Sequence, residues 1–408
     1  MTNDQDRAVL RDLAVEYREA AERPEMGSRR DLWRRHNSLK KTRPLVLVRG
    51  GKAFQHEIPD ITDLRCSDPF ARDIETALRK ELFLASLGDD RVVEPWFMIS
   101  AVHQCRGWGV EVQRQHAGDD LTAWKAAYPL KDLDDISALR MPDHRIDEQA
   151  TAERFERVTG WIGDLLPVTV NRAPAYCGFA GDLSTSLHYL RGIENFMMDM
   201  LDNADGLHRL VAFLRDGVLR THDQAEKVGD WCGVSHNNQA MPYAEELTDP
   251  EPGVSGLQRR QLWYFAAAQE FAGVGPAMHD AFLLQYQLPI LSKFGLVAYG
   301  CCEDLTRKID LLRQIPNLRR IAVTPWADVP RCAEQIGMDY VMSWRPNPTE
   351  MVCTDFRPER IRKLTREALE ASRGQHIDIM LKDIQTVQHQ PERLRDWVAI
   401  TREIAAGY

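Results

Sequence analysis

Two adjacent cysteines and a glutamate, Cys301, Cys302 and Glu303, follow directly on the apolar run LVAYG at 296–300. Thiolate, imidazole and carboxylate groups are the ligands of zinc sites, and a catalytic zinc keeps three protein ligands and one open position. Successive side chains of a strand alternate, so both cysteines can face one pocket only from a loop. Cysteines that merely pack in the interior are the alternative, and spacing alone leaves both interpretations open. The side chains that could complete a zinc site are His236, His279 and Asp383.

A run of five hydrogen-bonding side chains extends from Ser235 to Gln239. So many polar groups rarely lie together at a buried strand end without a ligand to satisfy them. An exposed turn rich in asparagine is the alternative. The place of this run after a short strand or strand end favours a ligand site, with His236 as a catalytic group and with Asn237, Asn238 and Gln239 as substrate-binding groups.

A third polar segment spans 343–348. Arg345 could hold a carboxylate or phosphate through two parallel hydrogen bonds, and Trp344 could wall a pocket, whereas an ion pair at the rim is the alternative. Trp326 also follows an apolar run, but Asp328 beside it is equally suited to cap a helix. The further substrate-binding side chains predicted from these segments are Tyr299, Trp326, Trp344, Arg345 and Asn347.

The elements that must position these groups are apolar runs alternating with amphipathic helices. The runs lie at 296–303, 319–328, 339–348 and 376–385. Such alternation predicts parallel strands with right-handed crossovers, whose carboxyl ends carry the site. We therefore predict an α/β fold, a (β/α)8 TIM barrel with an N-terminal helical extension. A doubly wound open sheet is the alternative, although no G-x-G-x-x-G motif follows any of the runs.

The first half of the chain shows the same alternation less regularly. The elements predicted there are helix over roughly the first 40 residues, strands at 44–51, 92–102 and within 166–181, helices at 150–166 and 193–229 with a break near 203–206, and short strands in the polar stretch 109–145. We divide the chain into residues 1–90, an N-terminal helical extension with the first strand, and residues 91–408, the barrel.

Composition narrows the classes of partner. The chain has 408 residues and a formal net charge of −9, which disfavours nucleic-acid binding. A basic cluster between Arg29 and Arg43 is interpreted as a solvated helix face. No run of about 18 apolar residues and no signal-peptide pattern is present. We therefore expect a cytoplasmic protein without membrane contact, whose eight scattered cysteines are thiols.

The second half of the chain resembles the uroporphyrinogen decarboxylase-like superfamily. The resemblance rests on PAMHDAFLLQYQLPILSKFGL, AYGCCEDL and HIDIMLKDIQTVQHQPERLRDWVAITREI, and weaker similarity covers most of the chain beyond about residue 90. The family implies a (β/α)8 barrel. Its decarboxylases carry an M-R-Q-A-G-R segment near the N-terminus that is missing here, so the chain looks closer to the zinc- and corrinoid-dependent methyltransferase branch.

The methyltransferase resemblance implies a metal-dependent transfer of a methyl group between a corrinoid or methylated small molecule and a thiol or folate. Those enzymes carry a His-x-Cys-Gly segment, in which Cys301 matches the cysteine and Tyr299 replaces the histidine. Lys382 and Asp383 lie near the place of the final cysteine. The assignments are zinc on Cys301, Cys302 and His279, and catalytic roles for Glu303, His236 and Asp383.

Two rival functions use the same residues. A metal-free decarboxylase or lyase would work through Asp383, His236 and Arg345, and a non-catalytic protein would bind a small ligand or a tetrapyrrole at the same rim. The partners considered are a small-molecule substrate, a corrinoid carried on a partner protein, and a second copy of the chain in a homodimer.

Overall fold

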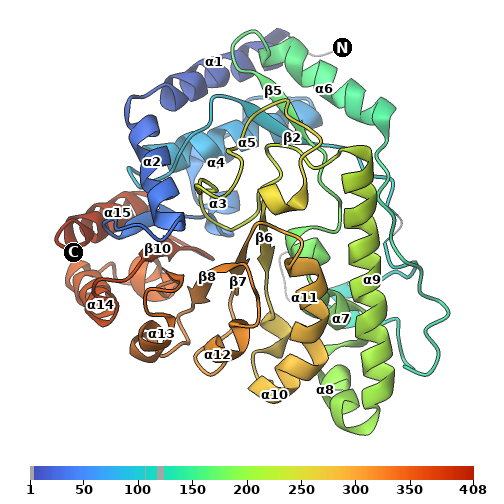
Figure 1. Ribbon diagram of the computed structural model, residues 1–408. Helices are drawn as coiled ribbons and strands as arrows, with labels where there is room; N and C mark the ends of the chain where they lie inside the picture. The colour runs from blue at the N-terminus through green and yellow to red at the C-terminus, as the bar shows by residue number, and fades with distance from the viewer. Residues whose placement is uncertain (1–3, 106, 117–123) are drawn as a thin grey trace.

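The computed structural model describes residues 4–105, 107–116 and 124–408. Six parallel strands form one sheet in the order β1-β10-β9-β8-β7-β6 (Figure 1). Their bounds are β1 Leu45–Val48, β6 Trp263–Ala266, β7 Leu296–Tyr299, β8 Leu318–Val323, β9 Val341–Trp344 and β10 Ile377–Leu381. Nearly all of their residues are buried, as expected for parallel strands covered on both faces.

The strand order is that of a barrel whose hydrogen-bonded ladder is incomplete. β1 pairs with β10, so the first and last strands of the described chain are neighbours. β2 (Phe97–Ser100) and β5 (Val168–Asn171) form a separate parallel pair. Among the described strands, no pairing joins β1 to β2 or β5 to β6. The fold is therefore mixed α/β and barrel-like, and the closed barrel predicted from the sequence is not present as a continuous ladder.

The strands predicted from apolar runs are confirmed, and one strand was missed. β6 is WYFA, a short and wholly buried run to which the sequence analysis assigned no element. The segment 232–239 forms no regular strand and makes only an isolated bridge between Cys232 and Ser255. The predicted short strands at 109–145 are β3 (Gln113–His116) and β4 (Trp124–Ala127), an antiparallel pair.

Helices surround the six-stranded sheet, and Figure 1 shows α9 to α15 following one another around its outer side. The break predicted near 203 lies between α8 and α9, where the Asn203 side chain accepts a hydrogen bond from the backbone of Gly206 and caps α9. The helix predicted at 277–295 ends at Leu291 and contains a π-helical turn. The longer helices are α1 Asp4–Ala21, α2 Glu25–Asn37, α5 Pro69–Ser86, α6 Glu148–Ile162, α7 Leu183–Arg191, α8 Ile193–Asp202, α9 Ala204–Val228, α13 Val329–Ile336, α14 Pro358–Ala371 and α15 Glu392–Ala405. The shorter ones are α3 Ala53–His56, α4 Pro59–Thr62, α10 Pro276–His279, α11 Gln285–Leu291 and α12 Ile309–Leu312.

The N-terminal helices are part of the same packed unit as the sheet. The Trp33 indole of α2 is buried and donates to the carbonyl of Asp90 over 2.7 Å. His36 of the same helix contacts the buried carboxylate of Asp378 in β10, at 3.1 Å, and Arg320 of β8 binds that carboxylate at 2.7 Å. A division at residue 90 would therefore separate β1 and α2 from the strand that both contact.

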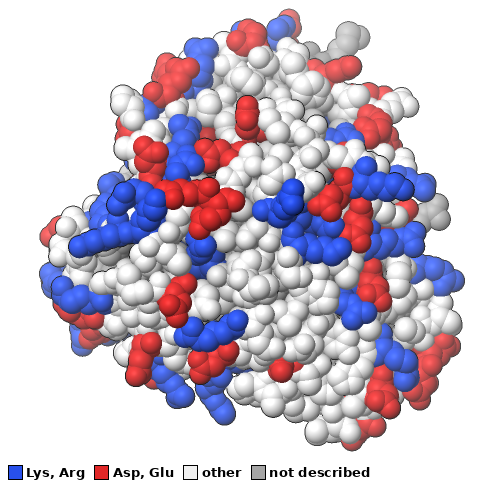
Figure 2. Space-filling model, in the orientation of Figure 1, with Lys and Arg blue, Asp and Glu red and all other residues white. Residues whose placement is uncertain are grey.

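The basic cluster between Arg29 and Arg43 is largely neutralised within the protein. Arg34 pairs with Asp249, Lys40 with Glu245, and Arg43 with Asp90. On the face shown in Figure 2, basic side chains are interspersed with acidic ones and form no extended surface of one sign. No helix in the described part of the chain is both long enough and apolar enough to cross a membrane.

Candidate functional site

In the loop after β7, the backbone turns so that the Cys301 side chain joins the buried cluster that contains Ala298. Gly300 has a φ of +98°, and a Cβ there would lie 2.7 Å from Leu305 and 3.0 Å from Ala322, so only glycine fits this turn. Ala298 and Cys301 lie in the same buried cluster, whereas Tyr299 packs in a different one, among the helices. The left-handed turn thus resets the alternation of the strand and directs the Cys301 thiol inward.

The Glu303 side chain holds this loop in place by accepting hydrogen bonds from backbone N–H groups. One carboxylate oxygen accepts from the backbone N–H of Ala268 over 2.7 Å, and the other accepts from those of Cys301 and Cys302 over 2.9 and 3.0 Å. The side chain is buried, and three charge-assisted bonds fix its position. Glu303 therefore holds the two cysteines in place, a positioning role that differs from the catalytic role predicted from the sequence.

The two thiols lie together beside a lysine. The Sγ atoms of Cys301 and Cys302 are 3.5 Å apart, and the Lys382 ammonium lies 3.0 Å from the first and 3.6 Å from the second. The hydrogen bond from Cys302, together with the positive charges of Lys382 and Arg345, outweighs burial and lowers the pKa of Cys301 to about 6. The same proton sharing raises the pKa of Cys302. The two thiols therefore titrate as a pair, and the direction of the shifts favours the negative charge on Cys301, the sulfur nearer to Lys382.

The segment after β10 supplies the lysine and a carboxylate. Lys382 Nζ lies 3.0 Å from Asp383 Oδ2, and the Cys302 thiol lies 3.7 Å from the same oxygen. Asp383 has a φ of +56°, a left-handed conformation that is uncommon for residues other than glycine and is often found at functional sites. Arg345, after β9, donates to the carbonyl oxygen of Cys301. The structure thus brings together Cys301, Cys302, Arg345 and Asp383, which the sequence analysis had assigned to different roles.

A zinc ion held by Cys301, Cys302 and His279 does not fit this arrangement. His279 bonds the Tyr299 hydroxyl at 3.1 Å, and that hydroxyl donates to Gln287 over 2.7 Å, so both predicted site residues belong to a buried network within the helical layer. The cation beside the thiols is the Lys382 ammonium. Across the residues that the structure describes, no three His, Cys, Asp or Glu side chains gather as a metal site requires.

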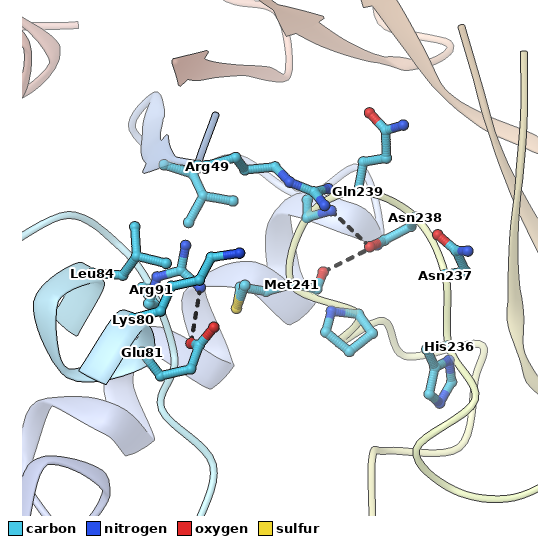
Figure 3. A pocket seen from close by; sticks show the side chains of 14 residues that line it. Arg49, Lys80, Glu81, Leu84, Arg91, His236, Asn237, Asn238, Gln239 and Met241 are labelled. Carbon is cyan, nitrogen blue, oxygen red and sulfur yellow. Dashed lines mark hydrogen bonds and ion pairs between the residues drawn. The ribbon is translucent and has the colours of Figure 1, made fainter. Parts of the chain in front are cut away.

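Figure 3 shows a cavity of about 280 Å³, whose lining residues include Arg49 but none of Cys301, Cys302, Arg345, Lys382 or Asp383. Its walls come from the end of β1, from α5 and from the segment 236–242. The polar run predicted to bind a ligand lies in the last of these walls, with His236, Asn237, Asn238 and Gln239 all lining the cavity. Gln239 has a φ of +63°. The cavity and the thiol cluster together therefore contain most of the polar groups singled out from the sequence.

The side chains of the polar run differ in what they do. Asn238 holds the loop itself, donating to the carbonyl of Met241 over 3.2 Å and accepting from the N–H of Ala240 over 2.9 Å. His236 accepts from the backbone of Trp263 through Nδ1 over 3.3 Å, and its Nε2 is buried. Burial lowers the pKa of His236 to about 4, so the ring is neutral at pH 7. Because Nδ1 accepts from Trp263, the proton of the neutral ring lies on Nε2, which can donate a hydrogen bond.

Arg49 links the cavity to the thiol cluster and was missed by the sequence analysis. It follows β1 directly and reaches the cavity, in which its side chain meets solvent. The surrounding protein and the positive charges of Arg345 and Arg91 lower the pKa of Arg49 to about 10. The signal was available, because Arg49 stands in the position after an apolar strand that we used to select the other candidates.

Three predicted substrate-binding residues lie elsewhere. Trp344 packs outside the sheet, in a groove lined by Val329 of α13 and by Leu364 of α14. Trp326 is 73% exposed. Asn347 accepts a hydrogen bond from the backbone of Thr349 over 3.0 Å. Asp328 caps α13, as the alternative interpretation of that segment predicted.

Comparison with known proteins gives a likeness of fold. No protein-family model matches the chain, and no curated protein matches it. Among solved structures, a methyltransferase from Methanosarcina mazei superposes with a TM-score of 0.53 at 12% sequence identity, over 92% of this chain and 98% of that one. The chain therefore shares its overall fold with that methyltransferase across nearly the whole length of both.

Proposed function

We propose that this protein is a methyltransferase built on a (β/α)8 barrel of the uroporphyrinogen decarboxylase-like kind, and that Cys301 is its nucleophile. The observation that carries the proposal is the environment of the Cys301 sulfur. This atom is buried in the loop after β7, with Lys382 Nζ at 3.0 Å and the Cys302 thiol at 3.5 Å. The shared fold with a methyltransferase supports the reaction class, and the carboxyl ends of parallel strands are where such folds place their chemistry.

The transfer step follows from the chemistry of a thiolate. The Cys301 sulfur attacks the methyl carbon of a donor, an S–CH3 bond forms as the bond between carbon and the leaving group breaks, and the electron pair departs with the leaving group. A second acceptor then removes the methyl group and restores the thiolate. Lys382 stabilises the thiolate before the attack, and it is placed to give a proton to a leaving group that needs one.

The other groups of the cluster act on this sulfur indirectly. Arg345 holds the backbone carbonyl of Cys301, and Glu303 holds the N–H groups of both cysteines, so the loop cannot rotate the sulfur away. Asp383 pairs with Lys382 and limits where the ammonium can lie. Fixed geometry of this kind contributes to rate by removing the cost of orientation.

A direct test uses methylcobalamin as the methyl donor, since a corrinoid is the donor that the sequence resemblance implies. The protein is incubated with methylcobalamin, and peptides are analysed by mass spectrometry for a methyl group on Cys301. We expect methylation of Cys301 in the wild type and in the control variant Cys105→Ala, and none in Cys301→Ala. Cys105 is partly exposed and lies outside the cluster, so it reports on general thiol reactivity.

Two results would count against the proposal. Methylation of several cysteines at similar rates would mean that Cys301 is not a selected nucleophile. Turnover of a cavity ligand that persists after Cys301 is replaced would instead favour the metal-free lyase built on His236, Asp383 and Arg345.

A further inference from the structure

The cavity shown in Figure 3 carries more positive than negative charge. Arg49, Lys80 and Arg91 line it, and Glu81 is the acidic residue among its lining groups. Arg91 lies 3.4 Å from Glu81, the carboxylate that partly offsets it. In the part of the chain that the structure describes, no carboxylate lies within ion-pair distance of the Arg49 guanidinium or the Lys80 ammonium. Two cations that line one cavity without counter-ions are stabilised by an anion that enters the cavity.

The walls also hold a buried donor that the protein leaves unused. The Nε of Arg91 is buried and has no hydrogen-bond partner among the described groups, whereas the His236 ring interacts with the backbone of Thr248. Figure 3 shows Arg49 and Gln239 near each other on one side of the cavity, with Arg91 and Lys80 across from the polar loop. Buried polar atoms are nearly always satisfied, so an orphaned donor beside a polar space indicates that a ligand supplies the missing acceptor.

A second cavity of about 420 Å³ adjoins the first and is mostly apolar. The two share six lining residues, among them Lys80, Arg91 and His236. The residues that line only the second cavity include Tyr17, Val92, Trp96, Phe97 and Met98. A polar, cationic end therefore continues into an aromatic and aliphatic end, which is the usual lining of a small-molecule site.

We propose that the two adjoining cavities bind a small amphipathic anion, with its carboxylate or phosphate head at Arg49 and Lys80 and its apolar body against Trp96 and Met98. Arg49 can present two parallel N–H groups to such a head, and the charges of Cys301 and Asp383 act on its guanidinium. That this anion is a substrate of Cys301 rests on the proposed function, whereas its binding does not.

Calorimetry with three probes of similar shape tests the site: 3-phenylpropionate, phenyl phosphate and the neutral 3-phenylpropanamide. We expect at least one of the two anions to bind, and the amide to bind about 10-fold or more weakly, since a charge-assisted pair is worth enough for that ratio. The preferred anion identifies the head group. Equal binding of the amide and both anions, or binding of none of the three, would overturn the proposal.

Variants assign the two ends of the ligand. Arg49→Gln should weaken binding of the preferred anion about 10- to 100-fold and leave the weak binding of the amide unchanged. Trp96→Ala should weaken the anion and the amide alike. Arg220→Gln makes the same substitution on the exposed surface of α9 and should change neither. An unchanged affinity in Arg49→Gln, with the anion still bound, would place the head elsewhere and contradict the assignment.

The test of anion binding can fail or succeed independently of the test of methyl transfer to Cys301. Cys301→Ala should retain binding of the anion while losing the ability to be methylated. Anion binding with no methylation of Cys301 would leave the site standing and remove its role in methyl transfer. Methylation of Cys301 without anion binding would support the proposed methyl transfer and overturn the anion site.

Discussion

A thiolate in the interior of a protein needs partners that replace the water it has lost. Cys301 is almost fully buried, which alone would raise its pKa. The Cys302 thiol supplies one hydrogen bond, and the Lys382 ammonium supplies a second along with its charge. Because these groups come from loops after β7 and β10, the thiolate depends on the pairing of distant parts of the chain.

Replacing Cys302 should raise the pKa of Cys301, because its hydrogen bond is the largest factor holding that pKa down. Cys302→Ser keeps a donor at the same place and should raise the pKa less than Cys302→Ala, which removes it. The pKa is measured from the ultraviolet absorbance of the thiolate as pH rises, taken as the difference from the Cys301→Ala protein. Equal values in the two Cys302 variants would show that the neighbouring donor has no part in stabilising the thiolate.

At the residue scale, the sequence identified chemically capable side chains better than it identified their roles. Cys301 and Cys302 were found because thiols after an apolar run are conspicuous. Lys382 was noted but assigned no role, because nothing local shows that its ammonium reaches a sulfur 81 residues away in the chain. Glu303 was predicted to be catalytic, and spacing could not reveal that its carboxylate accepts hydrogen bonds from three backbone N–H groups.

The loops after β1 and β10 pack against each other closely enough to require a glycine. A Cβ on Gly51 would lie 2.3 to 2.4 Å from the backbone of Ile384, so this loop can approach β10 only without a side chain. Arg49 and Lys382 are carried by these two loops. Their contact therefore joins the wall of the cavity to the thiol cluster.

Gly51→Ala should accordingly destabilise the protein, by about 1–3 kcal/mol, because backbone atoms must shift. Gly27→Ala is the matched control: Gly27 lies in α2, its Cβ would meet nothing within 4 Å, and the substitution should stabilise by about 0.4–1 kcal/mol. Thermal unfolding midpoints of the two variants should therefore move in opposite directions. A midpoint for Gly51→Ala at or above that of the wild type would show that the loop accommodates a Cβ at residue 51 without strain.

At the element scale, apolar runs between amphipathic helices located most strands, since parallel strands covered on both faces must be apolar. β6 was missed although it lies within an apolar run at 262–268, to which the sequence analysis assigned no element. It was harder to predict from the sequence which face of the sheet each side chain lies on. Trp344 and Arg345 are adjacent and so point to opposite faces, and Gly300 resets the alternation before Cys301. The left-handed turn at Gly300 depends on its contacts with Leu305 and Ala322, which only the fold reveals.

At the scale of the whole molecule, the sheet, its helices and the N-terminal pair α1 and α2 form one packed unit. The contact of His36 with Asp378 ties α2 to β10 through a buried carboxylate that Arg320 also binds. The pKa of Asp378 is held below its usual range by that arginine and that histidine despite burial. The division at residue 90 was drawn without information on the pairing of β1 with β10.

The whole protein should contain little zinc. Lys382 lies beside the thiols, and the described residues offer no third ligand, so elemental analysis of protein purified without chelator should give far less than one zinc per chain. EDTA should leave the alkylation rate of Cys301 unchanged. About one zinc per chain, lost in Cys301→Ala, would contradict the metal-free account and restore the zinc site expected from the sequence resemblance.

The central claim, that Cys301 is a thiolate stabilised by Lys382, is tested most directly by its rate of alkylation with iodoacetamide as a function of pH. Only the thiolate reacts, so the rate on Cys301 should rise as pH increases through about 6 and level off below pH 8. Lys382→Met should move this midpoint to higher pH, whereas Lys363→Met, on the exposed surface of α14, should leave it in place. A midpoint near the ordinary thiol value of about 8.5 in all three proteins would contradict the account, because Cys301 would then be a protonated thiol at neutral pH.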